Sequence, residues 1–172
     1  MRELDTNHID PRWELPSQAD HMTMRQTLGY LVWLGRLPET ALRSIVSRLR
    51  FKSDIRKMLI ETSRLNQILP TLVNTSPSNI VHAFESAPHL AIYAVYLANP
   101  QEALRTIVRK YVDHWSNVEP HTTGNDLRKL GLKPSPAYGR ILSSLRDAWL
   151  DGEVDTAEEE EALLSKLISE IG

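Results

Sequence analysis

Cysteine is absent from this 172-residue chain, and its absence removes several classes of function together. Without thiolates the chain has no disulfide framework, no cysteine-ligated zinc site and no cysteine nucleophile, which fits a reducing cytoplasm. No apolar run approaches the roughly 20 residues that cross a bilayer. The polar first 20 residues also lack the basic start and apolar stretch of a signal peptide. We therefore expect a soluble, cytoplasmic protein without membrane contact.

Sequence motifs for catalysis or metal binding are absent too. The seven glycines never gather into a loop that cradles phosphate, and the six histidines include no His-x-x-x-His pair. Carboxylates cluster chiefly at residues 158–161, where a solvated face at the start of a helix explains them. The sequence therefore predicts no catalytic residue and no metal site.

The small net charge of −2 hides an uneven distribution along the chain. Residues 1–149 hold 19 Lys or Arg against 14 Asp or Glu, whereas residues 150–172 hold one Lys against eight acids. Within the mildly basic part, residues 36–64 carry eight Lys or Arg against three acids. A solvated helical face and a surface that faces a polyanion both explain this stretch.

Apolar residues recur at helical spacing nearly throughout, and no segment has convincing strand character. We predict an all-α fold with a multi-helix body followed by a small helical tail subdomain. The predicted divisions are an extended or irregular segment at 1–20, a helical body at 21–115 and a tail at 124–172, with a loop at 116–124. Helix starts are expected where a cap residue precedes proline, at Ser76-Pro77, Asn99-Pro100 and Ser135-Pro136, and at the capping box of Thr156 and Glu159. The spacing also predicts that Trp115 and Trp149 are core residues rather than stacking platforms.

Residues 124–142 differ from ordinary helical sequence because glycine, proline and cations alternate there. We predict two helices joined by a tight turn, with exposed backbone N–H groups at the start of the second helix, beside Lys133 and Arg140. A helix N-terminus flanked by cations is a natural phosphate site. An ordinary helical hairpin with solvated cations is the alternative interpretation.

Several motifs in this region and upstream form a recognisable set. The tail carries Gly124-Asn125-Asp126-Leu127, Leu130-Gly131-Leu132-Lys133-Pro134, Tyr138-Gly139-x-Ile141-Leu142, Ala148-Trp149-Leu150-Asp151-Gly152 and Glu158-Glu159-Glu160. The upstream motifs are Arg48-Leu49-Arg50-Phe51, Ser76-Pro77-x-x-Ile80 and Ala94-Val95-Tyr96. The set resembles the body and tail of bacterial tRNA nucleotidyltransferases, the family of CCA-adding and A-adding enzymes and related poly(A) polymerases. The resemblance covers most of residues 25–165, and the chain departs from the family's Gly-Pro at Ser135-Pro136.

The resemblance implies an RNA-binding module that positions tRNA through backbone contacts for a catalytic head. The family's head carries a Gly-Ser and a metal-binding Asp-x-Asp, and this chain contains neither. Mg²⁺ and CTP or ATP would belong to that head, so the chain alone, as a fragment or a headless protein, is expected to have no cofactor and no catalytic activity. The expected RNA-binding residues are Lys133, Arg140 and Arg128 in the tail, followed by Arg105, Arg109 and Lys110 on the preceding helix.

Two other classes of function stay open at this point. A protein-interaction or dimerisation module, including a homodimer, would use the apolar helix faces and leave the cations in solvent. A DNA-binding helix-hairpin-helix protein is also compatible with the outline of residues 130–142. Steeply salt-dependent binding of nucleic acid, and a preference for tRNA over duplex DNA, separate these three classes.

Overall fold

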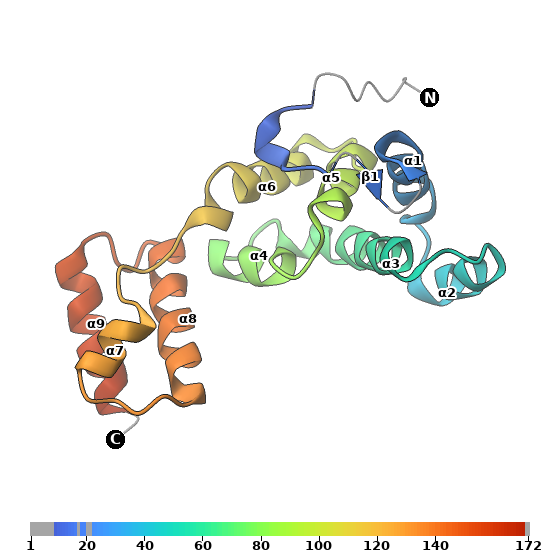
Figure 1. Ribbon diagram of the computed structural model, residues 1–172. Helices are drawn as coiled ribbons and strands as arrows, with labels where there is room; N and C mark the ends of the chain where they lie inside the picture. Colours follow the sequence, from blue (N-terminus) through green and yellow to red (C-terminus); the bar gives the residue numbers. More distant parts are fainter. Residues whose placement is uncertain (1–8, 17, 20–21, 171–172) are drawn as a thin grey trace.

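The computed structural model describes residues 9–16, 18–19 and 22–170, and the chain is all-α, as the sequence predicts (Figure 1). The body contains α1 (Met24–Leu34), α2 (Glu39–Arg48), α3 (Ser53–Ile68), α4 (Pro77–Phe84), α5 (His89–Ala98) and α6 (Glu102–Asp113). The tail contains α7 (Gly124–Lys129), α8 (Pro136–Asp151) and α9 (Ala157–Ser169). Three 3-10 helices and two strands complete the described elements: η1 (Pro11–Trp13), η2 (Leu69–Leu72), η3 (Trp115–Asn117), β1 (Gln18–Ala19) and β2 (Met22–Thr23).

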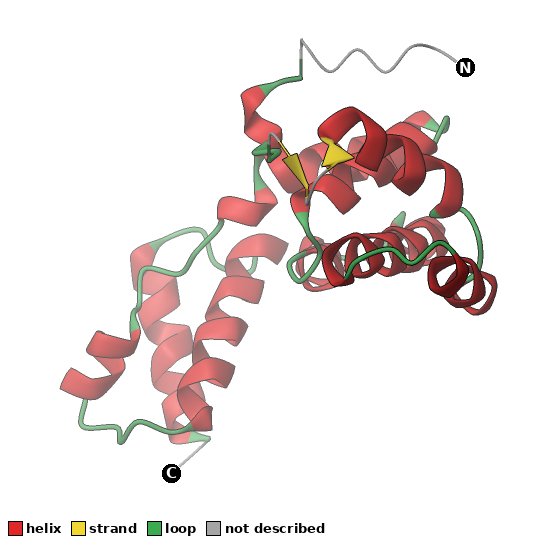
Figure 2. Ribbon diagram, turned by 45° about the vertical axis from the view of Figure 1, so that its right-hand side comes forward, coloured by secondary structure: helices red, strands yellow, loops and turns green. Residues whose placement is uncertain are grey.

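The described part of residues 1–20 is more ordered than the sequence suggests. Residues 1–8, 17 and 20 lie outside the described residues, but η1 forms after Asp10, whose side chain accepts a hydrogen bond from the N–H of Arg12. Trp13 packs against the rings of Tyr93 and Tyr96, at centroid distances of 4.7 and 5.0 Å. Strands β1 and β2 then pair antiparallel over two residues each (Figure 2).

Two of the three predicted Ser/Asn-Pro helix starts are correct, and the third is wrong. Helices α4 and α8 begin at Pro77 and Pro136. Helix α6 begins at Glu102 instead of Pro100, because the side-chain amide of Asn99 donates backwards, to the carbonyl of Val95 and to Asn66. Asn99 therefore closes α5 and does not cap α6.

The predicted end of α6 also needs correction. The helix stops at Asp113, so Trp115 lies in η3 and not on the apolar stripe of α6. Its ring is half-buried and still packs on the body core. Trp149 is also half-buried, on α8.

The core is built from three apolar clusters that fix the tail beside the body. Two clusters lie in the body, one around Leu31, Leu59 and Leu90 and the other around Phe84. The second body cluster also takes Leu150 from α8. The third cluster lies wholly in the tail, and its buried members are Leu127, Ile141, Leu145 and Leu164. The tail thus has a core of its own, and α8 is shared between the two parts.

Candidate nucleic-acid interface

The turn between α7 and α8 is built by local hydrogen bonds. Gly131 adopts a left-handed conformation with φ of +84°, which lets the chain reverse after α7 at little steric cost. The hydroxyl of Tyr138 donates to the carbonyl of Leu132 at 2.6 Å, and the N–H of Leu132 donates to the carbonyl of Leu127. These bonds connect the turn to α7 and to α8, so they fix the backbone conformation from which its side chains project.

The start of α8 does not offer the exposed N–H groups that the sequence suggested. Pro136 has no N–H, and the N–H of Ala137 donates to the side-chain oxygen of Ser135 at 3.3 Å. The N–H of Tyr138 donates to the carbonyl of Ser135 at 3.0 Å. Because the helix caps itself, any phosphate site at this turn depends on its cations.

The three tail cations singled out from the sequence have no carboxylate partner among the described residues. Lys133 and Arg140 are exposed, and neither makes a hydrogen bond or ion pair there. Arg128 is exposed and donates only to the side-chain oxygen of Asn125. Their neighbour Lys129 differs, because its ammonium group lies 2.9 Å from the carboxylate of Asp126. The turn therefore presents three positive charges that nothing in the described structure neutralises directly.

The cations of α6 are more occupied. The guanidinium of Arg105 lies 4.4 Å from the ring centre of Tyr96 and donates to its hydroxyl at 2.6 Å. Arg109 is paired with the carboxylate of Glu102. The ammonium group of Lys110 lies 5.8 Å from the ring centre of Trp115 and is exposed. Of the three, Lys110 keeps the most freedom to contact a ligand.

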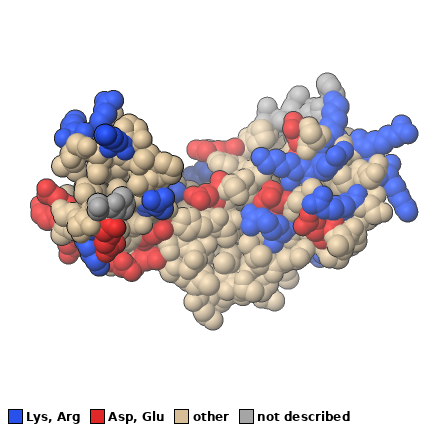
Figure 3. Space-filling view, turned by 90° about the horizontal axis from the view of Figure 1, so that it is seen from below, with Lys and Arg blue, Asp and Glu red and all other residues tan. Residues whose placement is uncertain are grey.

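The structure does not bring the two sets of cations together. Helix α6 lies in the body, whereas the α7–α8 turn lies at the end of the tail that is remote from the body (Figure 1). Seen from below, lysine and arginine gather toward the two ends of one face, at the tail and at the end of the body that carries α2 and α3 (Figure 3).

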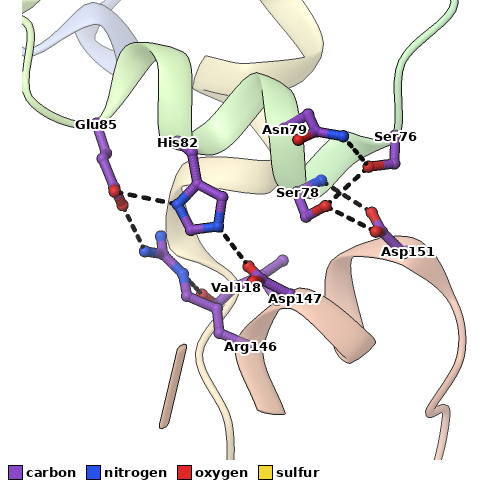
Figure 4. A network of polar contacts seen from close by, with 9 residues as sticks. All are labelled: Ser76, Ser78, Asn79, His82, Glu85, Val118, Arg146, Asp147 and Asp151. Atoms are coloured by element: carbon purple, nitrogen blue, oxygen red, sulfur yellow. Dashed lines mark hydrogen bonds and ion pairs between the residues drawn. The ribbon is translucent and has the colours of Figure 1, made fainter. Parts of the chain in front are cut away.

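Contacts between α4 and α8 that no sequence motif predicts join the tail to the body (Figure 4). The carboxylate of Asp151 accepts hydrogen bonds from the N–H and the hydroxyl of Ser78, at 2.8 and 2.7 Å. One turn away on both helices, His82 Nε2 lies 2.8 Å from Asp147 Oδ1. Asp147 and Asp151 therefore lie on the same face of α8 and dock on one face of α4.

Arg146 extends this contact to the segment that leads into the tail. Its guanidinium lies 3.1 Å from Glu85 and donates to the carbonyls of Val118 and Ser116. The pKa of His82 is raised: its contact with Asp147 has the largest effect, burial opposes it, and Glu85 raises the pKa further. Protonation of His82 thus strengthens the α4–α8 contact.

Glu160 is the second determinant of tail geometry, and the interpretation of residues 158–161 as a solvated run was wrong for it. Only 2% of this residue is exposed. Its carboxylate accepts from the N–H groups of His121 and Thr122 at 2.9 and 2.7 Å, from the hydroxyl of Thr122 and from the indole N–H of Trp149. Burial raises the pKa of Glu160, but the hydrogen bonds from Thr122, Trp149 and His121 outweigh it and leave the pKa lowered. Glu160 therefore joins α9 to α8 and to the linker at residues 121–122.

Two features are absent from the part of the chain that the structure describes. No helix there is long and apolar enough to span a bilayer, and no group of three or more His, Asp or Glu side chains there is arranged to hold a metal ion.

Comparison with characterised proteins gives one informative similarity. Over 81 residues the chain is 31% identical to an A-adding tRNA nucleotidyltransferase of Geobacter sulfurreducens. The match covers 47% of this chain but 9% of that protein, so the relative is far longer. No family model and no solved structure matches the chain. The similarity supports a relation to tRNA nucleotidyltransferases, in line with the motifs of the tail.

Proposed function

We propose that this chain is an RNA-binding module that holds tRNA by its sugar-phosphate backbone for the catalytic head of a tRNA nucleotidyltransferase or poly(A) polymerase. The observation that carries the proposal is that Lys133 in the α7–α8 turn, Arg128 on α7 and Arg140 on α8 are all exposed and have no carboxylate partner among the described residues. The partial similarity to an A-adding tRNA nucleotidyltransferase supports tRNA as the ligand.

Backbone recognition suits such a task physically. Phosphate contacts fix the position of a nucleic acid without reading its sequence. Folded RNA is recognised mainly by shape and backbone, which all tRNAs share. Lys110, Arg105 and Arg109 on α6 form a second, weaker set, because the guanidinium groups of Arg105 and Arg109 are already engaged by Tyr96 and Glu102.

Binding of tRNA by the intact chain tests the proposal. We expect affinity for folded tRNA to exceed affinity for a duplex DNA of equal charge, and to fall steeply as KCl rises from 50 to 200 mM. Equal affinity for both nucleic acids would favour the helix-hairpin-helix alternative. Undetectable tRNA binding at low salt would refute the proposal.

The chemistry is assigned to the head, so the chain alone should add no nucleotide to tRNA in the presence of Mg²⁺, CTP and ATP. Two-metal phosphoryl transfer needs carboxylates around the ions, and the sequence contains no Asp-x-Asp. The measurement is incorporation of labelled nucleotide by metal-stripped, repurified chain. Incorporation above a protein-free control would contradict this assignment.

A protein-interaction module is the second candidate, and Trp33 is the observation that favours it. This large aromatic side chain on α1 is 70% exposed. Exposed tryptophan is typical of contact surfaces in protein complexes. Light scattering over a range of concentrations tests the homodimer: a dimer that Trp33→Ser abolishes would support this second function.

A further inference from the structure

A pocket of about 350 Å³ is lined by residues of α2, of α3 and of the loop between them. Helix α2 lies at the end of the body opposite the tail (Figure 1). The wall of the pocket combines positive charge, a hydroxyl and apolar surface, and none of the described residues that line it carries a carboxylate. The lining includes Arg43, Arg50, Arg56, Ser47, Val46 and Phe51. Such a combination fits a ligand with an anionic group and a less polar remainder, and its size lies at the lower end of small-ligand sites.

Arg50 is held in a conformation that arginine rarely adopts. Its φ is +52°, a left-handed value that a non-glycine residue adopts at a steric cost. Helix α2 ends at Arg48 with Leu49 as its cap, so Arg50 occupies the next position, where glycine is the usual residue. Backbone strain of this kind gathers at binding sites. Glycine would adopt this backbone conformation at less cost. The presence of arginine here therefore indicates that its guanidinium group has a role, such as binding a ligand.

Some polar groups of the pocket already have partners within the protein, and others do not. Arg43 is paired with Glu39, and Arg56 donates to the carbonyl of Phe51 at 3.4 Å. Within the described residues, the guanidinium of Arg50 and the hydroxyl of Ser47 have no partner. A guanidinium and a hydroxyl at one site match the oxygens of a phosphate group.

Apolar surface completes the match. Val46 is buried and Phe51 half-buried, and the Phe51 ring packs edge-on against Tyr30, which fixes its orientation. A sugar and base attached to the phosphate would lie against this wall, since bases and riboses have apolar faces. Inorganic phosphate alone would leave the wall uncovered.

We propose that this pocket binds a phosphodiester group of the same RNA that the α7–α8 turn contacts, as a second point of attachment at the far end of the molecule. The inference rests on the proposed function for the identity of the RNA. The gathering of cations at both ends of one face supports it (Figure 3). Two attachment points would fix the direction of the RNA relative to the body, which one point cannot do.

Arg50→Gly in the intact chain is the central variant, because it removes the cation and relieves the strained backbone at once. We expect the slope of log K for tRNA against log salt to fall by about 0.7–0.9, the value for one lost phosphate contact, with Tm unchanged or higher. Arg48→Ala is the matched control, since Arg48 has the same charge near the same helix end, is exposed and does not line the pocket. Equal losses of affinity in the two variants would mean that tRNA responds to the overall positive charge of this region. That result would contradict the pocket as a binding site.

Amide chemical shifts of the labelled chain separate this inference from the proposed function. A 5′-phosphorylated tetranucleotide should shift Ser47, Arg50 and Phe51 in the wild type and in Lys133→Ala/Arg140→Ala, but not in Arg50→Gly. Equal shifts with AMP at the same concentration would make a free nucleotide the occupant and refute the RNA assignment. Unperturbed pocket amides with a chain that binds tRNA would refute the inference alone. Perturbed amides with a chain that does not bind tRNA would refute the proposed function alone.

Discussion

Asp151 of α8 accepts two hydrogen bonds from Ser78 near the start of α4, 73 positions away in the sequence. Ser78 is the second residue of α4, so its N–H is one that the helix itself cannot satisfy. A carboxylate at this end of a helix is also favoured by the helix dipole. The tail thus supplies the cap of a body helix, and this contact couples the orientation of the α7–α8 turn to the body.

Replacement of Asp151 by alanine should weaken this coupling. Because Ser78 is 7% exposed, its N–H and hydroxyl would lose partners that water replaces poorly. We expect a loss of about 1–2 kcal/mol in the free energy of unfolding, measured in urea. Glu153→Ala is the control, since Glu153 is exposed and its side chain makes no hydrogen bond or ion pair within the described residues. A loss as large in the control would show that charge, not the cap, matters.

The α4–α8 contact should also depend on pH through His82. The folded-state pKa of His82 is raised by Asp147 and Glu85, so its contribution to stability is fully present below the unfolded value of about 6.5. That contribution is lost as pH rises through the folded-state pKa. Tm should therefore fall between pH 6 and 8 more in the wild type than in His82→Gln. Parallel Tm profiles of the two proteins would contradict the role of His82.

Glu160→Gln should destabilise the tail strongly. The amide would place donors against the N–H groups of His121 and Thr122, and we expect a loss of about 2–4 kcal/mol in unfolding free energy. Because the folded-state pKa of Glu160 is lowered, the wild-type contribution is present above pH 4.5 and is lost as pH falls through the folded value. Glu161→Gln, an exposed neighbour, should be nearly neutral by the same urea titration. Equal effects at both positions would return residues 158–161 to the solvated interpretation.

Features that depend on near neighbours in the sequence were predictable, and long-range polar contacts were not. The capping box of Thr156 and Glu159 formed as expected, because both of its bonds join residues three apart. Glu160 differs from Glu159 only in what lies opposite it, and its partners are 11 to 39 positions away. One signal existed, because Glu160 is in helical phase with Leu164 and Leu167 on the buried face of α9.

The sequence alone predicted which Lys and Arg residues lie near the candidate site. It did not predict which of them have no carboxylate partner. Lys129 and Lys133 are residues of the same type, but Lys129 follows Asp126 by three positions, and the helical conformation of α7 brings these two side chains together. That pair could have been predicted from the spacing, whereas the lack of a partner for Lys133 needed the structure. Ser135 looked like a helix cap, and it is one, but the same cap occupies the N–H group that a phosphate would use. The local geometry thus shifts the phosphate site from the helix end to the side chains of the turn.

The salt dependence of tRNA binding by Lys133→Ala/Arg140→Ala tests the central claim most directly. Both residues are exposed and unpaired within the described structure, so folding should be unchanged while about two phosphate contacts are lost. We expect the slope of log K against log salt to decrease by about 1.4–1.8, and by a similar amount for tRNAs of different sequence.

A single pair of variants supplies the internal control for that measurement. Lys133→Ala should lower the slope by about 0.7–0.9, whereas Lys129→Ala, which removes a lysine already paired with Asp126, should change it much less. An unchanged slope in the folded double variant, or equal changes for Lys129 and Lys133, would contradict the account of the α7–α8 turn as the RNA contact.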